Sequence, residues 1–324
     1  MKKVAAIFFA LLAVFAVSCS KAYEDPVNYA MGAAVTQKLW GAGEDCAARA
    51  LEAIIALEED ISYRKTGDVS KLNRGESIGT GPAYGIIKQS DELRRETNGA
   101  YDITVLPLVR AWGFDTDSPH LPSNEEIASA LALTGGENVV ITESGVSLKN
   151  GAQIDLSAAG KGAACEAAIE VYKSFGATGG IVTVGGSVGV FGAKDNGQIF
   201  KIAVRDPFDR SSAIAVLALT DTYISTSGSY EKNFVREGVT YHHLLDVKTG
   251  YPVQNGLVSV TVVCGSGALS DMLSSACFCM GMEESLPVLQ KYSAEALFIK
   301  ENGEISVTRG LVPYVECEKY EVLP

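Results

Sequence analysis

Residues 179–189 read GGIVTVGGSVG, and this stretch decides between two fold classes. Gly186 and Gly189 have the spacing of the last two glycines in a dinucleotide-binding fingerprint, but Val184 stands where the first glycine is needed. The residues after Gly189 continue as a strand instead of opening a helix, which excludes a doubly wound nucleotide-binding sheet. Glycines that flank strands more often form turns and bulges, although they also permit close approach of a flat ring or a phosphate.

The rest of the chain alternates groups of strands with single helices. Apolar residues at helical spacing predict helices over residues 43–62, 84–97, 160–175 and within 267–291, with another beginning at the capping box Ser123-Asn124-Glu125-Glu126. Alternating runs bounded by glycine predict strands within residues 139–156, 181–226, 240–246 and 258–264, and again from Glu295. We therefore expect an α+β fold with a largely antiparallel β-sheet core flanked by helices.

The chain begins MKKVAAIFFALLAVFAVSCS, which predicts an export signal. Two lysines precede the apolar run 4–17, which is shorter than the roughly 20 residues of a membrane-spanning helix. The sequence Ala16-Val17-Ser18-Cys19 resembles a bacterial lipobox, in which the cysteine is lipidated, although leucine is usual at the position of Ala16. An ordinary signal peptide cleaved nearby is the alternative. In both cases we expect the mature chain to act outside the cytoplasm.

Three segments follow from this pattern: a signal peptide with lipobox over 1–19, a short polar tether over 20–28, and a single domain over 29–324. A hydrophobic content of 47% supports a globular body with a substantial core. The net charge of −12 argues against a nucleic-acid partner, because there is no basic excess to neutralise phosphates. Any phosphate-bearing ligand must be held locally.

The six cysteines after Cys19 are scattered and lie mostly in apolar surroundings. They have neither the spacing of a zinc site nor that of a redox CxxC motif. We therefore expect buried thiols with at most one disulfide. These residues are Cys46, Cys165, Cys264, Cys277, Cys279 and Cys317.

Residues 155–162, DLSAAGKG, suit an anion site. Backbone amides and the positive end of a helix can hold phosphate oxygens, and Lys161 adds a point charge. The segment is not a P-loop, which requires glycine at the position of Asp155 and serine or threonine at that of Gly162. A helix start with a solvated lysine is the alternative.

Asp271 and Ser275 are four residues apart and so share one face of a helix. Carboxylate, hydroxyl and carbonyl oxygens suit a hard cation such as Mg²⁺. The alternative is an acidic residue in the first turn that complements the helix dipole.

Two of the three histidines, His242 and His243, are neighbours in the stretch YHHLLDVKTG over 241–250. Adjacent strand residues point to opposite faces, so at most one of the pair faces any given pocket. Ordinary histidines at a strand edge are the alternative interpretation.

Seven stretches, taken together and in order, resemble the ApbE family, whose fold is the ApbE-like or T-fold-like form of an α+β fold. The resemblance extends over nearly the whole mature chain, and the pattern around His243 and Asp246 is its most specific part. The stretches are residues 29–32, 99–114, 155–162, 184–187, 226–231, 243–252 and 271–275.

The ApbE family comprises flavin transferases, which take FAD and attach its FMN half through a phosphoester to a threonine of a target protein. The resemblance implies FAD as substrate and Mg²⁺ as cofactor, with Asp271, Ser275 and the backbone carbonyl of Ala158 as metal ligands. It implies that His243 and Lys161 are the catalytic residues.

The resemblance also implies which residues bind the flavin nucleotide: Met31, Tyr101, Asp102, Ala158, Lys161, Gly185, Gly186, Ser187, Thr226, Ser227, His243 and Asp246. The chain departs from the family pattern at four places: the family often has Thr at Ser275, Pro-Arg at Val247-Lys248, Gly-Thr at Gly32-Ala33 and Gly-Gly at Ser157-Ala158. Ser275 replaces a frequent threonine and keeps the hydroxyl. Ala33 replaces a threonine and removes a hydroxyl, which can alter the balance of activities.

The chain contains no copy of the Ser-Gly-Ala-Thr acceptor motif of family targets. We therefore expect the flavin to be placed on another protein, such as a membrane electron-transfer subunit exposed on the same side. We expect this chain to be exported and attached to the bacterial cell membrane by its lipid anchor, on the periplasmic or extracytoplasmic face. The alternatives are an Mg²⁺-dependent FAD pyrophosphatase and a flavin-binding lipoprotein without catalysis.

Overall fold

The computed structural model describes residues 22–324. The predicted signal peptide over 1–19, including Cys19, and residues 20–21 of the predicted tether lie outside the described residues. A ten-stranded sheet forms the centre, in the order β1-β3-β6-β7-β10-β13-β14-β15-β17, with β2 paired to β3. Its strands are β1 (Tyr23–Glu24), β2 (Asn28–Ala30), β3 (Ala33–Trp40), β6 (Gly179–Val184), β7 (Ser187–Gly192), β10 (Thr222–Gly228), β13 (Leu257–Cys264), β14 (Glu295–Lys300), β15 (Ile305–Thr308) and β17 (Glu321–Leu323).

Neighbouring strands of this sheet are antiparallel except for β15 and β17. This arrangement confirms the predicted α+β fold with a largely antiparallel core. Side chains alternate between two buried faces, as the period of a strand requires. In β14, Phe298 contributes to the core beneath the helices, whereas Leu297 and Ile299 contribute to the core on the opposite face.

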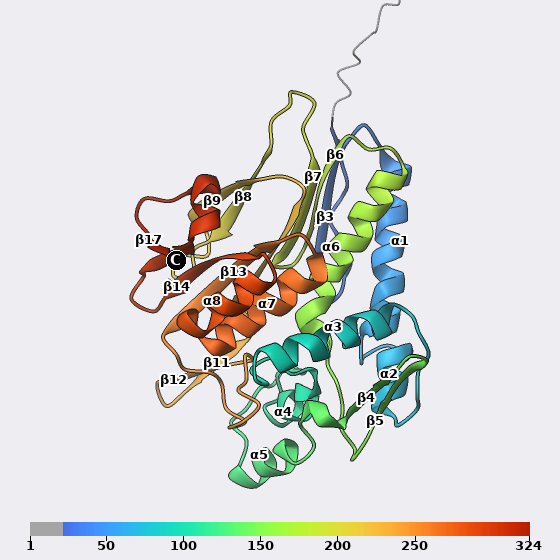
Figure 1. The fold of residues 1–324 in the computed structure, drawn as a ribbon, viewed down its shortest axis with the longest axis vertical. Coiled ribbons are helices and arrows are strands. Elements are labelled where there is room, and N and C mark those ends of the chain that lie inside the picture. The colour runs from blue at the N-terminus through green and yellow to red at the C-terminus, as the bar shows by residue number, and fades with distance from the viewer. Residues whose placement is uncertain (1–21) are drawn as a thin grey trace, which may run out of the picture.

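Each face of the sheet is covered by a different layer. Four helices cover one face: α1 (Glu44–Ile61), α6 (Ser157–Ser174), α7 (Gly267–Met280) and α8 (Met282–Lys291) (Figure 1). The opposite face shares a core with a small sheet formed by β8 (Phe200–Arg205), β9 (Ala213–Leu219) and β16 (Val315–Glu316). Both faces of the large sheet are therefore removed from solvent, which explains its long apolar strands.

The segment between α1 and α6 forms a layer at the lower end of the molecule in Figure 1. The hairpin of β11 (Asn233–Arg236) and β12 (Val239–His242) packs against it, with the rings of Phe114 and Phe234 6.0 Å apart. The elements of this layer are α2 (Asp68–Asn73), α3 (Pro82–Glu96), η1 (Ile103–Val105), α4 (Leu106–Ala111), α5 (Asn124–Leu131), η2 (Gly136–Asn138), β4 (Val139–Thr142) and β5 (Gly145–Leu148). A further short helix, η3 (Arg309–Tyr314), follows β15.

Local signals in the sequence place several helix ends correctly. Ser123 and Glu126 form the predicted capping box of α5, each side chain bonded to the backbone of the other residue. The helix α3 ends immediately before Thr97, and Asn98 and Gly99 then both take a positive φ, as expected for residues that terminate a helix.

Three predicted boundaries are wrong. The helix α6 begins at Ser157, not at Gly160, because the Asp155 carboxylate accepts a hydrogen bond from the Ser157 amide and starts the helix one turn earlier. The strand predicted over 240–246 ends at His242. Part of the predicted tether belongs to the sheet, since β1 pairs with β3.

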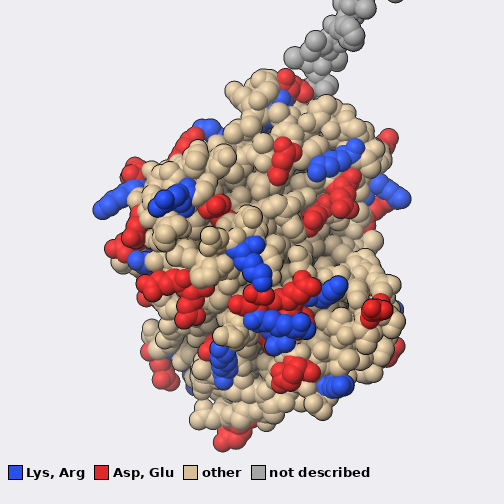
Figure 2. Space-filling model, in the orientation of Figure 1, with Lys and Arg blue, Asp and Glu red and all other residues tan. Residues whose placement is uncertain are grey.

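All six cysteines within residues 22–324 are free thiols. Cys46, Cys165, Cys264 and Cys277 are buried, as predicted, whereas Cys279 and Cys317 are partly exposed. Acidic and basic side chains are interspersed on the face shown in Figure 2. Over the part of the chain that the structure describes, no helix has both the length and the apolar character to cross a membrane.

The helices α6 and α7 cross in direct backbone contact. A Cβ atom placed on Gly162 would lie 1.9 Å from the carbonyl oxygen of Gly267, and one placed on Gly267 would lie 2.2 Å from that of Gly162. These distances leave no room for any side chain at the crossing. The pair of glycines therefore fixes how closely the two helices approach.

We expect Gly162→Ala to lower the free energy of unfolding by about 1–3 kcal/mol, because the added methyl group forces the two backbones apart. Gly85→Ala is the matched control, since Gly85 lies in the exposed part of α3 with open space around it. There alanine should stabilise the protein by up to about 1 kcal/mol through helix propensity. Urea denaturation measures both changes, and equal effects of the two substitutions would contradict the close crossing.

Candidate active site

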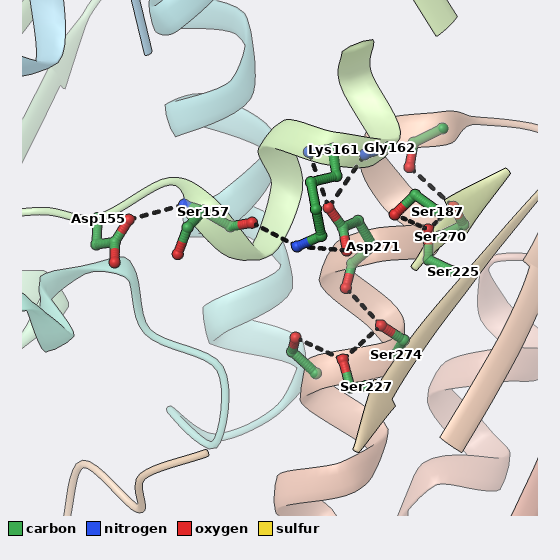
Figure 3. A network of polar contacts seen from close by, with 12 residues as sticks. Asp155, Ser157, Lys161, Gly162, Ser187, Ser225, Ser227, Ser270, Asp271 and Ser274 are labelled. Carbon is green, nitrogen blue, oxygen red and sulfur yellow. Dashed lines mark hydrogen bonds and ion pairs between the residues drawn. The ribbon is translucent and has the colours of Figure 1, made fainter. Parts of the chain in front are cut away.

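Carboxylates on α6 and α7 bind backbone amides of the other helix across this crossing. Asp271 on α7 accepts hydrogen bonds from the amides of Lys161 and Gly162, both at 3.1 Å to Oδ2 (Figure 3). In the reverse direction, Glu166 Oε2 accepts from the Gly267 and Ala268 amides, at 3.0 and 3.2 Å. These bonds fix the first turns of α6 against α7 and hold the Asp271 carboxylate in place.

The second oxygen of Asp271 keeps acceptor capacity. Asp271 is buried, at 3% exposure, and its Oδ1 lies 4.0 Å from Lys161 Nζ, too far for a hydrogen bond. The Lys161 ammonium is partly exposed and also lies 3.5 Å from the Ser157 carbonyl oxygen. A carboxylate oxygen and an ammonium thus lie side by side, and both can bind a further group.

Serine hydroxyls connect β10 with α7 beside Asp271. The Ser227 hydroxyl lies 2.8 Å from that of Ser274 and 3.0 Å from that of Ser275. One strand position earlier on the same face, Ser225 bonds Ser270 on α7, at 2.9 Å, and Ser187 on β7, at 3.0 Å (Figure 3). The predicted residues Ser187, Ser227 and Ser275 therefore belong to one polar network.

These oxygens fit a hard cation. Asp271 Oδ1, the Ser275 hydroxyl and backbone carbonyls at the start of α6 are the ligand types that Mg²⁺ prefers. In a regular α-helix the Gly162 amide donates its hydrogen bond to the Ala158 carbonyl. Here the Gly162 amide also donates to Asp271. The Ala158 carbonyl oxygen therefore keeps capacity to bind another partner. Within residues 22–324 no group of three or more His, Cys, Asp or Glu residues could hold a metal ion. Because the site offers a single carboxylate, a bound metal ion would need oxygens of a substrate and water molecules to complete its coordination shell.

Gly185 lies against the Lys161 side chain, and Met31 lies against α6 at Gly160. A Cβ atom on Gly185, which has φ of 57°, would lie 3.3 Å from Lys161 Cδ. Met31 also has a positive φ, and its methyl carbon lies 2.9 Å from the position a Cβ atom on Gly160 would take. Gly186, the residue after Gly185, is bound to Thr226 of β10: the Thr226 amide donates to the Gly186 carbonyl at 3.2 Å.

The two adjacent histidines have different environments. His242 is buried, its Nε2 lies 3.0 Å from the Val253 carbonyl oxygen, and its ring packs edge-on against Phe278. His243 is partly exposed, and the Lys232 carbonyl oxygen accepts from its backbone amide at 3.0 Å and lies 3.3 Å from its Nδ1. This contact assigns the proton to Nδ1 and leaves the lone pair of Nε2 available. The two rings thus lie in different surroundings, and that His243 faces a ligand pocket stays a prediction.

Electrostatics keep the His243 imidazole neutral. Burial, followed by the positive charges of Lys232 and Lys161, lowers the pKa of His243 to about 3. Burial also lowers the pKa of Lys232 and raises that of Asp155, although Lys232 and Lys161 both act in the opposite direction on Asp155. The positive charges of Lys232 and Lys161 therefore act on both His243 and Asp155.

Lys232 and Tyr63 were missed as site residues in the sequence, and Asp155 was recognised only as part of a motif. Lys232 directly follows Glu231, the last residue of the family stretch 226–231, and this position was the one hint in the sequence that Lys232 lies near the site. The Tyr63 ring lies beneath two guanidinium groups, 5.1 Å from Arg64 and 5.8 Å from Arg110. Burial raises the pKa of Tyr63, and the nearby charge of Asp155 raises it further.

Three other predicted residues have structural contacts that occupy their polar groups. Asp102 accepts from the amides of Thr104 and Gly136, at 2.8 and 2.9 Å. Asp246 holds its own turn by accepting from the Lys248 amide, at 2.8 Å. Tyr101 is buried, with its hydroxyl 3.4 Å from that of Ser90. A role in ligand binding for these three residues stays a prediction.

Comparisons with known proteins match most of this chain. The model of the ApbE family matches residues 31–298. A protein of Vibrio cholerae named FAD:protein FMN transferase is 31% identical over 247 residues, which are 74% of each chain. A Salmonella typhimurium protein with the same name is 29% identical over 255 residues, 75% of this chain and 73% of that protein.

Solved structures show the same likeness in three dimensions. The crystal structure of the ApbE protein of Thermotoga maritima matches with a TM-score of 0.84 and 32% identity, over 91% of this chain and 99% of that chain. The flavin transferase ApbE of Vibrio cholerae matches with a TM-score of 0.80 and 27% identity, over 91% and 99% of the two chains.

We expect the His243 imidazole to remain neutral when the pH is lowered from 7.5 to about 5, because its pKa lies near 3 in the folded protein. Proton NMR of the imidazole ring checks this, with His243→Gln used to assign the signal. The pKa of His243 in the folded protein lies below the ordinary value of 6.5, so the unfolded chain takes up a proton first as the pH falls. The contribution of His243 to the free energy of unfolding is therefore full above about pH 6.5 and is lost as the pH falls towards 3.

Lys232→Met provides the control for the electrostatic cause. Removal of this positive charge should raise the pKa of His243 while its backbone carbonyl stays in place. An imidazole signal that moves with a midpoint near 6.5 in the unchanged protein would show that neither partial burial nor the two lysines lowers the pKa of His243.

Proposed function

The chain belongs to the ApbE family, and on this basis we propose that it transfers FMN from FAD to a threonine hydroxyl of an acceptor protein and releases AMP. Its main support in this site is the Asp271 carboxylate, which has one oxygen available 4.0 Å from the Lys161 ammonium, while the positive charge of Lys161 also acts on the His243 imidazole. An anionic substrate and a nucleophilic hydroxyl need groups of this kind.

We propose that the diphosphate of FAD lies over the start of α6. Lys161 supplies a positive charge there, and Met31 and Gly185 border this part of α6. Asp271, Ser275 and the Ala158 carbonyl would hold Mg²⁺. The metal would neutralise charge on the diphosphate, which explains how a chain of net charge −12 binds an anion.

The chain's own groups can manage the proton and the leaving group. Nε2 of His243 takes the proton of the threonine hydroxyl as its oxygen forms a bond to the FMN phosphorus. The bond from that phosphorus to the bridging oxygen breaks, and AMP leaves with the electron pair. Lys161 offsets the negative charge that develops on the departing phosphate. Since the Lys232 carbonyl holds Nδ1, the imidazole presents Nε2 in a fixed orientation.

Two alternatives use the same site. Water in place of the threonine hydroxyl would hydrolyse FAD to FMN and AMP, and a protein that only stores FAD would bind it without turnover. The position of a neutral base beside two lysines favours catalysis over storage. We further propose export and attachment to the bacterial cell membrane through Cys19, on the evidence of residues 1–20 alone, with an acceptor exposed on the same side.

We expect flavin transfer to require a divalent cation and Asp271. EDTA should abolish the transfer of FMN to a carrier protein with a Ser-Gly-Ala-Thr site, and Mg²⁺ should restore it. Asp271→Asn keeps an oxygen for the Lys161 and Gly162 amides but removes the charge, and should lower the rate about 10²–10³-fold. In-gel flavin fluorescence measures the adduct. Full transfer in EDTA would contradict the metal requirement.

His243→Gln should lower kcat for transfer about 10²–10⁴-fold with little change in FAD affinity, because the amide cannot take a proton. His242→Gln is the matched control, since His242 packs in the core and should affect stability more than transfer. Mass spectrometry distinguishes the alternatives in the same samples. Free FMN and AMP without a protein adduct would indicate a pyrophosphatase, and intact FAD would indicate a binding protein.

A further inference from the structure

The described chain joins the large sheet at the end of β3 that lies farthest from the site. Ala22 packs against the core shared with the small sheet, and Tyr23 of β1 pairs with Leu39 near the end of β3. From there β1 and β2 follow the edge of β3 to the turn at Met31, which lies against the start of α6. The entry point and the site therefore lie at opposite ends of one strand.

Three connections meet around this entry point. The Thr178 amide donates to the Trp40 carbonyl at 2.8 Å, and the Thr178 carbonyl accepts from the Ala193 amide at 3.4 Å. These bonds join the segments before α1, after α6 and after β7, which gather at the upper end of the molecule in Figure 1. Two apolar side chains of these segments face solvent, since Phe175 is 49% exposed and Ile199 is 43% exposed. We call this surface the entry end.

Two elements place the site at the same distance from the entry end. The helix α6 carries Lys161 near its start and ends at Ser174, and between these residues it rises about 20 Å. The strand β6 begins at Gly179, beside the entry end, and the turn at Gly185 that follows it lies against Lys161. Extended chain between these two glycines also spans about 20 Å. The site thus lies about 20 Å from the entry end.

The proposed lipid anchor lies close to the entry end. Cys19 precedes Ala22 by three positions, and extended chain of that length spans at most about 11 Å. Because Ala22 packs against the core, a lipid on Cys19 would hold the entry end within this distance of the bilayer. The site, at the opposite end of the same strands, is not held in this way.

Electrostatic attraction to lipid adds little at the entry end. Lys173 and Lys194 bring positive charge, but acidic residues lie in the first turn of α1 and directly after Lys194. Anionic lipids attract clusters of basic residues, and the described residues of this end do not form one. The short tether and the exposed apolar side chains are therefore the features that fit a lipid surface.

The edge of the sheet offers a competing orientation. Tyr29 in β2 is 79% exposed and lies between the entry end and the site along this edge. A molecule lying on this edge would bring the site down to the bilayer. The entry end has two exposed apolar side chains and the start of the tether, which makes it the better contact with lipid.

Resting on the proposed attachment through Cys19, we propose that the entry end lies on the bilayer and that the site is held about 20 Å above it. The partner of this surface is the headgroup region of a lipid bilayer. The acceptor protein must then present its threonine hydroxyl at that height. A threonine close to the bilayer stays out of reach.

The orientation is measured on the full, lipidated chain in vesicles and needs no turnover. Cys279 and Cys317, the partly exposed thiols, are first replaced by serine. A fluorophore is then attached at Ser174→Cys beside the entry end, at Tyr29→Cys on the sheet edge or at Ser129→Cys on α5, at the lower end of the molecule (Figure 1). Lipids with a quencher in the headgroup should remove most of the fluorescence at position 174, less at 29 and almost none at 129. Zwitterionic and anionic vesicles should give the same order.

A lipid-anchored carrier protein tests the height of the site. Its Ser-Gly-Ala-Thr site is placed either directly at the bilayer or at the end of a rigid helical spacer of about 20 Å. We expect the spacer to raise the rate of flavin transfer on the vesicle at least about tenfold. The control inserts a flexible Gly-Ser segment of about 20 residues between Ser20 and Lys21, which frees the body from the bilayer and should remove the difference.

The outcomes separate this inference from the function on which it rests. A label at Tyr29 or Ser129 that is quenched as strongly as the label at Ser174 would overturn the orientation. Equal transfer to both anchored carriers would show that the site is not held above the bilayer, while the transferase function stands. If mass spectrometry finds no lipid on Cys19, the attachment and this inference fail together. If no carrier is labelled, the transferase function fails, and the quenching still decides the orientation.

Discussion

The backbones of Gly162 and Gly267 touch where α6 crosses α7, and the site is built around this contact. Close approach brings the Asp271 carboxylate to the amides of Lys161 and Gly162 and, in the other direction, Glu166 to the start of α7. Side chains at the crossing would lengthen all of these bonds together. The position of the functional carboxylate is therefore set by the absence of two Cβ atoms, and only secondarily by its own helix.

Around this framework, burial and mutual repulsion control the ionisation of the charged groups. Lys161 and Lys232 lie near the imidazole of His243, and the same desolvation disfavours charge on His243, Lys232 and Asp155. A bound anion would relieve the repulsion and favour the protonated forms of His243 and Lys232. Binding of the proposed anionic substrate would therefore raise the proton affinity of His243.

Much of the fold could be predicted from local patterns, whereas part of the site could not. The capping box at Ser123 and the helix end before Asn98 depend on neighbours in the sequence, and both are correct. Lys232 belongs to the site because a hairpin brings its carbonyl to His243, and its place directly after the stretch 226–231 does not reveal that pairing. Asp102 and Asp246 show the opposite difficulty, since an aspartate that holds a turn has the same sequence signature as one that binds a ligand.

The free thiols differ in how readily an oxidant can reach them. Burial raises the pKa of Cys264 to about 11 and that of Cys277 to about 12, so neither forms a thiolate readily. Cys279 and Cys317 are partly exposed. Among the thiols of residues 22–324, an oxidant in the solvent therefore meets these two first.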